Sequence, residues 1–232
     1  MHQLLERKHG IAIRPDMEVE AGIYVGEYLA DRRFAGMTGS PEGLDDYYNK
    51  PVWNLPRRNG NNGPEVLPDA YYDGAELHET GVKQKIINAL ESGRPVWIFV
   101  RTNDTARWLR IAEEAMRDVR HSGRTPVADK PLLYSDAGLH RGRNRVEARS
   151  ERLRLEREMG KPGNVVVATQ RAGRGTHIEL SDQAKANGGA FALVTHWMPD
   201  RQRTQTIGRV GRGGDPGSAQ FLLDSRSDPA LM

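Results

Sequence analysis

Two arginines in a glycine-rich stretch are the residues of this sequence best suited to chemistry. Arg209 and Arg212 stand three positions apart within Gln205–Asp215, and four glycines lie among them. Glycine inside a helix costs about 1 kcal/mol relative to alanine, so this composition indicates a backbone that passes close to another group. Guanidinium groups at positions i and i+3 share one helix face, where they can bind phosphate oxygens and neutralise charge as a phosphoryl bond breaks. The spacing predicts an arginine finger; the alternative is a solvated basic helix end.

A second stretch suited to phosphate follows an apolar run. Val165–Thr169 has the pattern of a buried strand, and it leads directly into a loop that contains Gly173, Arg174, Gly175 and Thr176. In an open parallel sheet, ligands bind outside the carboxyl ends of the strands, and glycines there let backbone amides approach phosphate. For the loop alone, a simple tight turn is the alternative. Together, the two stretches predict a nucleotide site at adjacent strand ends of one sheet.

Composition narrows the class of protein. The sequence has 232 residues, 37% of them hydrophobic, which is enough to bury a sizeable core in one or two domains. Its 34 basic and 31 acidic residues give a net charge of +3, and it has no cysteine, which fits a reducing cytoplasm. No apolar run is long enough to span a bilayer, and the sequence contains neither a metal-ligand cluster nor a Gly-x-x-x-x-Gly-Lys-Ser/Thr phosphate loop. By itself, the chain lacks the parts that grip ATP and its metal.

From about residue 76 the sequence alternates helical and strand patterns. One expected helix has an apolar stripe of Val82, Ile86, Ile87 and Leu90 and stops at Gly93 and Pro95. The next carries an inner face of Trp108, Ile111, Ala112, Ala115, Met116 and Val119. The expected strands are Val96–Val100, Leu132–Tyr134, Val165–Thr169, Ala190–Thr195 and Gln220–Leu223. This alternation predicts an α/β fold with a doubly wound parallel sheet flanked by helices.

Three further features receive structural rather than functional interpretations. The arginine-rich segment Arg141–Arg157 contains interleaved glutamates, and it is predicted to be a salt-bridged surface helix held down by Val146 and Leu153. A nucleic-acid surface is the alternative, but the segment has no aromatic residue for bases to stack on. Trp197 is expected to cap the core, with stacking on a base or a partner peptide as the alternative. His177 is expected to be a hydrogen-bonding loop residue rather than a base.

Taken as a set, these motifs resemble a known family. Ala172-Gly173-Arg174-Gly175-Thr176 is similar to the Ala-Gly-Arg-Gly-Thr-Asp segment of the SecA preprotein translocase ATPase. Gly208–Ser218 is similar to the family's Gly-Arg-x-Gly-Arg-x-Gly-Asp-Pro-Gly-Ser, and Gly36–Ser40 resembles the Gly-Met-Thr-Gly-Thr that closes its first motor domain. The segments occur in the family's order across nearly the whole chain. His177 is a departure, because it stands where the family has aspartate.

The resemblance implies a RecA-like fold of the superfamily two helicase type, P-loop NTPase-like but lacking the P-loop itself. Residues 1–75 would be the end of the first motor domain plus a linker, and residues 76–232 would be the second, helicase C-terminal motor domain. ATP with Mg²⁺ would bind between the two lobes, with the metal held mainly by the lobe that this chain lacks. ATP hydrolysis is therefore expected only together with a first motor lobe.

Site residues are carried over on the matching positions. Arg212 would be the finger that stabilises the transferring phosphoryl group, with Arg209 beside it. The nucleotide-binding positions implied by the resemblance are Gly173, Arg174, Gly175, Thr176, Gln205 and Asp215. The implied partners are the first motor lobe of a parent protein, a translocating polypeptide and a membrane protein-conducting channel, at the inner face of the cell membrane. The sequence stops at a point where proteins of the family continue, so we expect this chain to be a piece of a longer protein.

Two other functions stay open on the sequence. Many helicases use the same Gln-x-x-Gly-Arg-x-Gly-Arg layout, so the chain fits the C-terminal motor lobe of a nucleic-acid helicase. Alternatively, it fits a degenerate lobe that no longer turns over ATP and acts as a docking module, with His177 as the sign of that loss.

Overall fold

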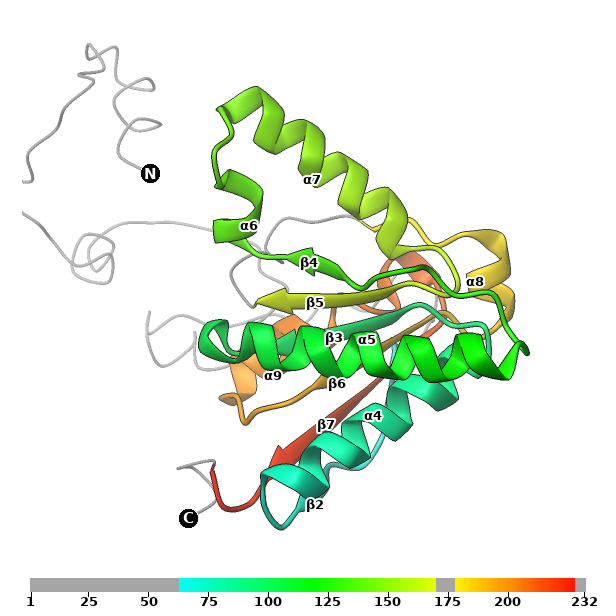
Figure 1. The fold of residues 1–232 in the computed structure, drawn as a ribbon, viewed down its shortest axis with the longest axis vertical. Helices are drawn as coiled ribbons and strands as arrows, with labels where there is room; N and C mark the ends of the chain where they lie inside the picture. The colour runs from blue at the N-terminus through cyan, green and yellow to red at the C-terminus, as the bar shows by residue number, and fades with distance from the viewer. Residues whose placement is uncertain (1–62, 170–177, 228–232) are drawn as a thin grey trace, which may run out of the picture. The chain divides into compact units, whose positions relative to one another are not determined.

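The computed structural model describes residues 63–169 and 178–227, and within them the apolar runs form one parallel sheet (Figure 1). Its strands are β1 (Glu65–Val66), β2 (Ala70–Tyr72), β3 (Val96–Val100), β4 (Leu132–Tyr134), β5 (Val165–Thr169), β6 (Ala190–Val194) and β7 (Gly217–Asp224). They lie in the order β1-β7-β6-β3-β5-β4, with β2 also paired to β7, and every pair is parallel. Every residue of β3, β5 and β6 is buried, as expected for strands covered on both faces.

One face of the sheet is covered by two long helices, α4 (Ala75–Glu91) and α5 (Thr105–Ser122) (Figure 1). The short 3-10 helix η1 (Thr102–Asp104) connects β3 to α5. All six predicted inner-face residues of α5 are buried, as are Val82, Ile86 and Leu90 of α4, while Ile87 is half-buried. The 3.6-residue period of apolar positions therefore located both helices and the faces that they bury.

The other face carries α6 (Asp136–His140), α7 (Arg145–Met159), α8 (Asp182–Ala186) and α9 (Asp200–Ile207). Asn144 and Glu147 form a capping box at the start of α7. The predicted pair of Arg152 with Glu156 is present at 2.7 Å, so the interpretation of α7 as a salt-bridged helix is confirmed.

The prediction that Val146 and Leu153 hold α7 down is wrong. Val146 is 74% exposed and Leu153 is 47% exposed, whereas Ala148, Leu155 and Met159 are buried in the core. Successive helix residues are rotated by about 100°, so Leu155 and Ala148 share the inner face and the two predicted anchors lie opposite them. The buried face of α7 is therefore formed by Ala148, Leu155 and Met159.

After the neighbouring strands β3 and β5, the chain continues into helices on opposite faces of the sheet. The helix that follows β3 is α5, which packs on the α4 face, while the next described helix after β5 is α8, which packs on the other. A parallel sheet with helices of its crossovers on both faces is doubly wound, so the predicted α/β fold with a doubly wound parallel sheet flanked by helices is confirmed.

The strands before residue 75 join the same sheet. β1 pairs with β7 at Ser218 and Ala219, and β2 pairs with it from Leu222 to Asp224. Residues 65–72 therefore pack with the predicted second motor domain. The division into residues 1–75 and 76–232 stays a prediction.

Candidate functional site

The arginine segment, Gln205–Asp215, begins as a helix and ends as a series of turns. α9 stops at Ile207, and Gly208 is its C-cap. Gly211 then has φ +65°, and Arg212 opens a separate 3-10 helix, η2 (Arg212–Gly214). Since Arg209 falls between the two helices, the prediction that Arg209 and Arg212 share one helix face is wrong. Glycines that favour turns, rather than a continuous helix, set the spacing of the two guanidinium groups.

Gly211 passes close to the protein's own backbone. A Cβ atom added there would lie 2.8 Å from the amide nitrogen of Pro64, and one added at Gly217 would lie 2.9 Å from the nitrogen of Gly211. The close approach that the glycines indicate therefore occurs at Gly211 against Pro64 and the first residue of β7. At this position the glycine has a structural reason that involves no ligand.

The start of α9 is fixed by an arginine that the sequence analysis left aside. The guanidinium of Arg203 donates to both carboxylate oxygens of Asp69 at 2.9 and 3.0 Å, and its carbon lies 3.7 Å from the centroid of the Phe221 ring. Both bonds are charge-assisted and come from one nitrogen, Nη2, and the position over the Phe221 ring adds a cation–π contact. Arg203 thus ties the helix that leads into the arginine segment both to β7 and to the chain between β1 and β2.

The predicted site residues of this segment have different surroundings. Arg212 is exposed, and Arg209 and Gln205 are half-buried. Asp215 is half-buried, and one of its carboxylate oxygens lies 2.9 Å from Nζ of Lys185. The hydrogen bond that Lys185 donates to Asp215 raises the pKa of Lys185 above its ordinary value. Asp215 therefore forms an ion pair within the protein, so contact with a nucleotide would require it to share or exchange this partner.

The arginine segment and the end of β5 lie at opposite edges of the sheet. Gly211 sits against Gly217, the first residue of β7, which in turn lies close to the carbonyl of Ala190, the first residue of β6. In a parallel sheet these positions mark the amino edge, while Thr169 ends β5 at the carboxyl edge. The prediction of adjacent strand ends is therefore wrong, because α9 runs back along the sheet before Arg209, as a right-handed crossover requires.

The second predicted phosphate stretch lies outside the described residues. This applies to Gly173, Arg174, Gly175 and Thr176, and also to His177. Its convergence with Arg209 and Arg212 stays a prediction. Trp197 is described, and it is 38% exposed, while the neighbouring Met198 is buried in the core. The expected core-capping role of Trp197 is therefore wrong.

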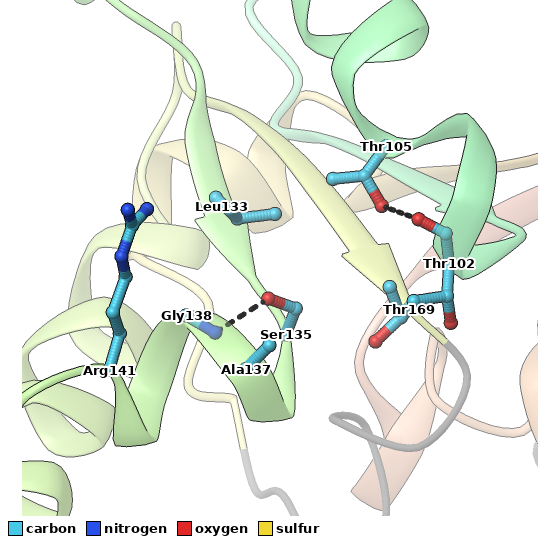
Figure 2. Close-up of a pocket in the computed structure, with 8 residues that line it drawn as sticks. All are labelled: Thr102, Thr105, Leu133, Ser135, Ala137, Gly138, Arg141 and Thr169. Atoms are coloured by element: carbon cyan, nitrogen blue, oxygen red, sulfur yellow. Dashed lines mark hydrogen bonds between the residues drawn. The ribbon is translucent and has the colours of Figure 1, made fainter.

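A hollow of about 450 Å³ lies at the carboxyl edge, and none of the residues that line it was assigned to a site from the sequence (Figure 2). We call it the hydroxyl hollow; it is lined by Thr102, Thr105, Leu133, Ser135, Ala137, Gly138, Arg141 and Thr169. Polar residues directly after the apolar runs that form β3 and β4 were the signal for it. Strand exits in a doubly wound sheet gather at one edge, so these residues could have been grouped from the predicted topology.

The described residues hold neither a cluster of metal-ligating side chains nor a membrane-spanning helix. Within residues 63–169 and 178–227, no group of three histidine, cysteine, aspartate or glutamate side chains could hold a metal ion. In the same part of the chain, no helix has the length and apolar character needed to cross a membrane.

Comparison with known proteins identifies relatives over almost the whole chain. No family model matches the sequence. The protein translocase subunit SecA of Cytophaga hutchinsonii is 30% identical over 229 residues, which cover 96% of this chain and 18% of that protein. The chain is homologous to SecA. SecA 2 of Listeria monocytogenes is 26% identical over 234 residues, covering 98% of this chain and 27% of the relative, so the chain matches only a minor part of each SecA protein.

Solved structures add a more distant likeness. The crystal structure of T. fusca Cas3 with ATP has a TM-score of 0.44 and 16% sequence identity, and the match covers 76% of this chain and 20% of that one. The resemblance to SecA, which rests on the motifs around Gly173 and Arg212, is confirmed by the homologues rather than by this structure.

Proposed function

We propose that this chain is the second motor lobe of a SecA-like, ATP-dependent protein translocase, and that Arg212 completes an ATP site whose remaining parts belong to a first lobe. The observation that carries the proposal is the similarity to proteins named protein translocase subunit SecA along 96% of the chain. The parallel α/β sheet agrees with it, as a motor lobe needs a rigid frame for residues that face a partner lobe.

The residues of the arginine segment fit an anionic ligand. Arg212 is exposed on η2, and the half-buried Arg209 lies three positions earlier, in the turn after α9. Bound ATP with Mg²⁺ supplies the phosphoryl group that is transferred to water. Arg212 would donate hydrogen bonds to the phosphate oxygens and neutralise their charge as the bond to the leaving group lengthens.

The scaffold around the segment holds these guanidiniums in place. Arg203 fixes the start of α9 through Asp69, and Gly211 sets the turn that separates Arg209 from Arg212. A finger stabilises a transition state only if it is positioned before the reaction, because reorganisation would otherwise cost part of the gain. Gln205 and Asp215 are assigned to nucleotide contact on the family resemblance, as are Gly173, Arg174, Gly175 and Thr176.

The experiment is to measure ATP turnover by a longer chain that also carries the first motor lobe. We expect Arg212→Ala to lower turnover by about 10³-fold, the scale of an arginine finger. Arg201→Ala is the matched control, since Arg201 is an exposed arginine of α9 that lies outside the arginine segment. Turnover that is the same in both variants would exclude Arg212 as the finger. The further partners that we propose are a translocating polypeptide and a membrane channel, with the protein peripheral to the membrane.

A further inference from the structure

The outward side of α7 combines exposed aliphatic side chains with arginines. Val146 is 74% exposed and Leu153 is 47% exposed. They stand seven positions apart, so they point in nearly the same direction and lie about 10 Å apart along the helix axis. We call this surface the outer α7 face; its exposed residues are Val146, Arg149, Ser150, Leu153 and Arg157.

The four glutamates of α7 lie to the sides of this face, and all are engaged within the protein. Each accepts a hydrogen bond of 2.7 to 2.9 Å: Glu147 from the backbone N–H of Asn144, Glu151 from Arg154, Glu156 from Arg152, and Glu158 from Lys161. Arg149 and Arg157 differ, because neither makes a hydrogen bond or an ion pair within residues 63–169 and 178–227. The outer α7 face therefore carries a surplus of positive charge beside its aliphatic side chains.

Two classes of ligand fit this combination poorly. Sites for single-stranded nucleic acid stack bases on aromatic rings, and α7 contains no aromatic residue. Phosphates would also leave Val146 and Leu153 without an apolar partner. A helix that lies in a bilayer surface inserts a broad apolar face. In α7 the other apolar residues, Ala148, Leu155 and Met159, are buried in the core, so only a narrow apolar strip faces outward.

A partner helix matches both the spacing and the charge. Seven residues is the repeat at which one helix packs along another, so Val146 and Leu153 would each contact an apolar residue of a helix with the same repeat. Carboxylates beside that apolar strip would pair with Arg149 and Arg157, since the planar fork of a guanidinium suits a carboxylate. We propose that the outer α7 face docks an acidic amphipathic helix of a partner protein. This goes beyond the proposed function, because such docking needs neither ATP nor Arg212.

The test is binding of a designed helix to the 232-residue chain, followed by fluorescence anisotropy. The probe is a labelled peptide of about three heptads, with leucine at the a and d positions and glutamate beside them. Arg149→Glu/Arg157→Glu should weaken its binding about tenfold, because two attractive charges become repulsive. Val146→Ser/Leu153→Ser should weaken it about fivefold, because the apolar contact is lost. Circular dichroism checks that each variant is folded.

Arg117→Glu/Arg201→Glu is the matched control, because it makes the same change in net charge at exposed arginines of α5 and α9. It should bind the peptide like the unchanged chain, and a peptide of the same composition in scrambled order should bind at least tenfold more weakly.

The inference would be overturned by a control variant that loses as much affinity as Arg149→Glu/Arg157→Glu, or by a serine variant that loses none. Absence of peptide binding, or equal binding of the scrambled peptide, would overturn it as well. Oligo-deoxythymidine or phosphatidylglycerol vesicles that bind more tightly than the peptide, and through the same two arginines, would assign the outer α7 face to nucleic acid or to a membrane instead.

Discussion

The arginine segment and the hydroxyl hollow occupy opposite edges of one sheet, and the protein builds them in different ways. The arginine segment gets its shape from contacts that the chain makes with itself: Arg203 binds Asp69, Lys185 binds Asp215, and Gly211 packs against Pro64. The hollow is formed by the ends of β3, β4 and β5, and within the described part of the chain the hydroxyls of Thr102 and Thr169 make no hydrogen bond, whereas those of Thr105 and Ser135 do.

This difference separates stability from binding. Where polar groups are already engaged, a substitution removes native contacts and lowers the free energy of unfolding. Where a rigid sheet leaves groups unengaged, a substitution changes what a ligand meets and costs the fold little. Changes in the arginine segment should therefore be costly to stability, and changes to the hydroxyls of Thr102 and Thr169 should cost the fold little. Three measurements can break or sharpen this contrast.

The largest effect is expected at Gly211. Alanine there would need φ near +65°, and its Cβ would lie 2.8 Å from the Pro64 nitrogen. Either the backbone at Pro64 or the turn at Gly211 would therefore have to shift. We expect Gly211→Ala to lower the free energy of unfolding by about 3 kcal/mol, combining left-handed strain with the clash. Denaturant unfolding measures this loss.

Gly213 provides the matched control inside the same segment. It has φ +70°, but an added Cβ would meet no atom within 4 Å, so Gly213→Ala carries the strain without the clash. A loss of about 1 kcal/mol is expected. If both variants lose the same free energy, the contact with Pro64 does not shape the arginine segment.

A smaller effect is expected at the ion pair of Arg203 and Asp69. Their side chains are 23% and 21% exposed, so solvent screens the pair only in part. Arg203→Ala should cost about 2 kcal/mol, because it also removes the contact with the Phe221 ring. In a double-mutant cycle with Asp69→Asn, we expect a coupling of about 1 kcal/mol, and additive losses would show that the pair is not linked energetically.

The sequence predicted the sheet better than it predicted the sites. Val96–Val100 and Val165–Thr169 are apolar at every position or nearly so, and burial on both faces leaves such a run little choice but a central strand. The inner face of α5 was likewise determined by period alone. These features depend on local sequence, and the predictions made from them were confirmed.

Errors arose where tertiary contacts decided the outcome. The three-residue spacing of Arg209 and Arg212 could not reveal that α9 ends at Ile207. The turn that follows depends on the contact of Gly211 with Pro64, which lies about 150 residues earlier in the chain. In α7, two apolar sets of residues competed for the core, and only packing selected Leu155 over Leu153. The hydroxyl hollow was missed because its residues come from three strand exits and form no motif along the chain.

The smallest expected effect is a dependence of the free energy of unfolding on pH, and it again distinguishes the arginine segment from the hydroxyl hollow. His78 of α4 is 2% exposed, its Nε2 donates to the carbonyl of Leu222 in β7 at 2.8 Å, and its Nδ1 has no partner within the described residues. Burial lowers the pKa of His78, the charge of Arg107 lowers it further, and the bond to Leu222 opposes the shift. The unfolded chain therefore binds a proton more readily than the folded one.

Stability should consequently fall as the pH drops below about 6.5, the ordinary pKa of histidine, and should stay level above it. His78→Gln keeps a donor for Leu222 but cannot titrate, so its unfolding free energy should lose this dependence, while His121→Gln, at an exposed position, should retain it. Hydrogen exchange at mildly acid pH should rise first in α4 and β7, the strand that starts at the arginine segment, before it rises in β4 and β5 beside the hydroxyl hollow. Simultaneous loosening of all four elements would mean that the two edges do not differ in how their contacts are built.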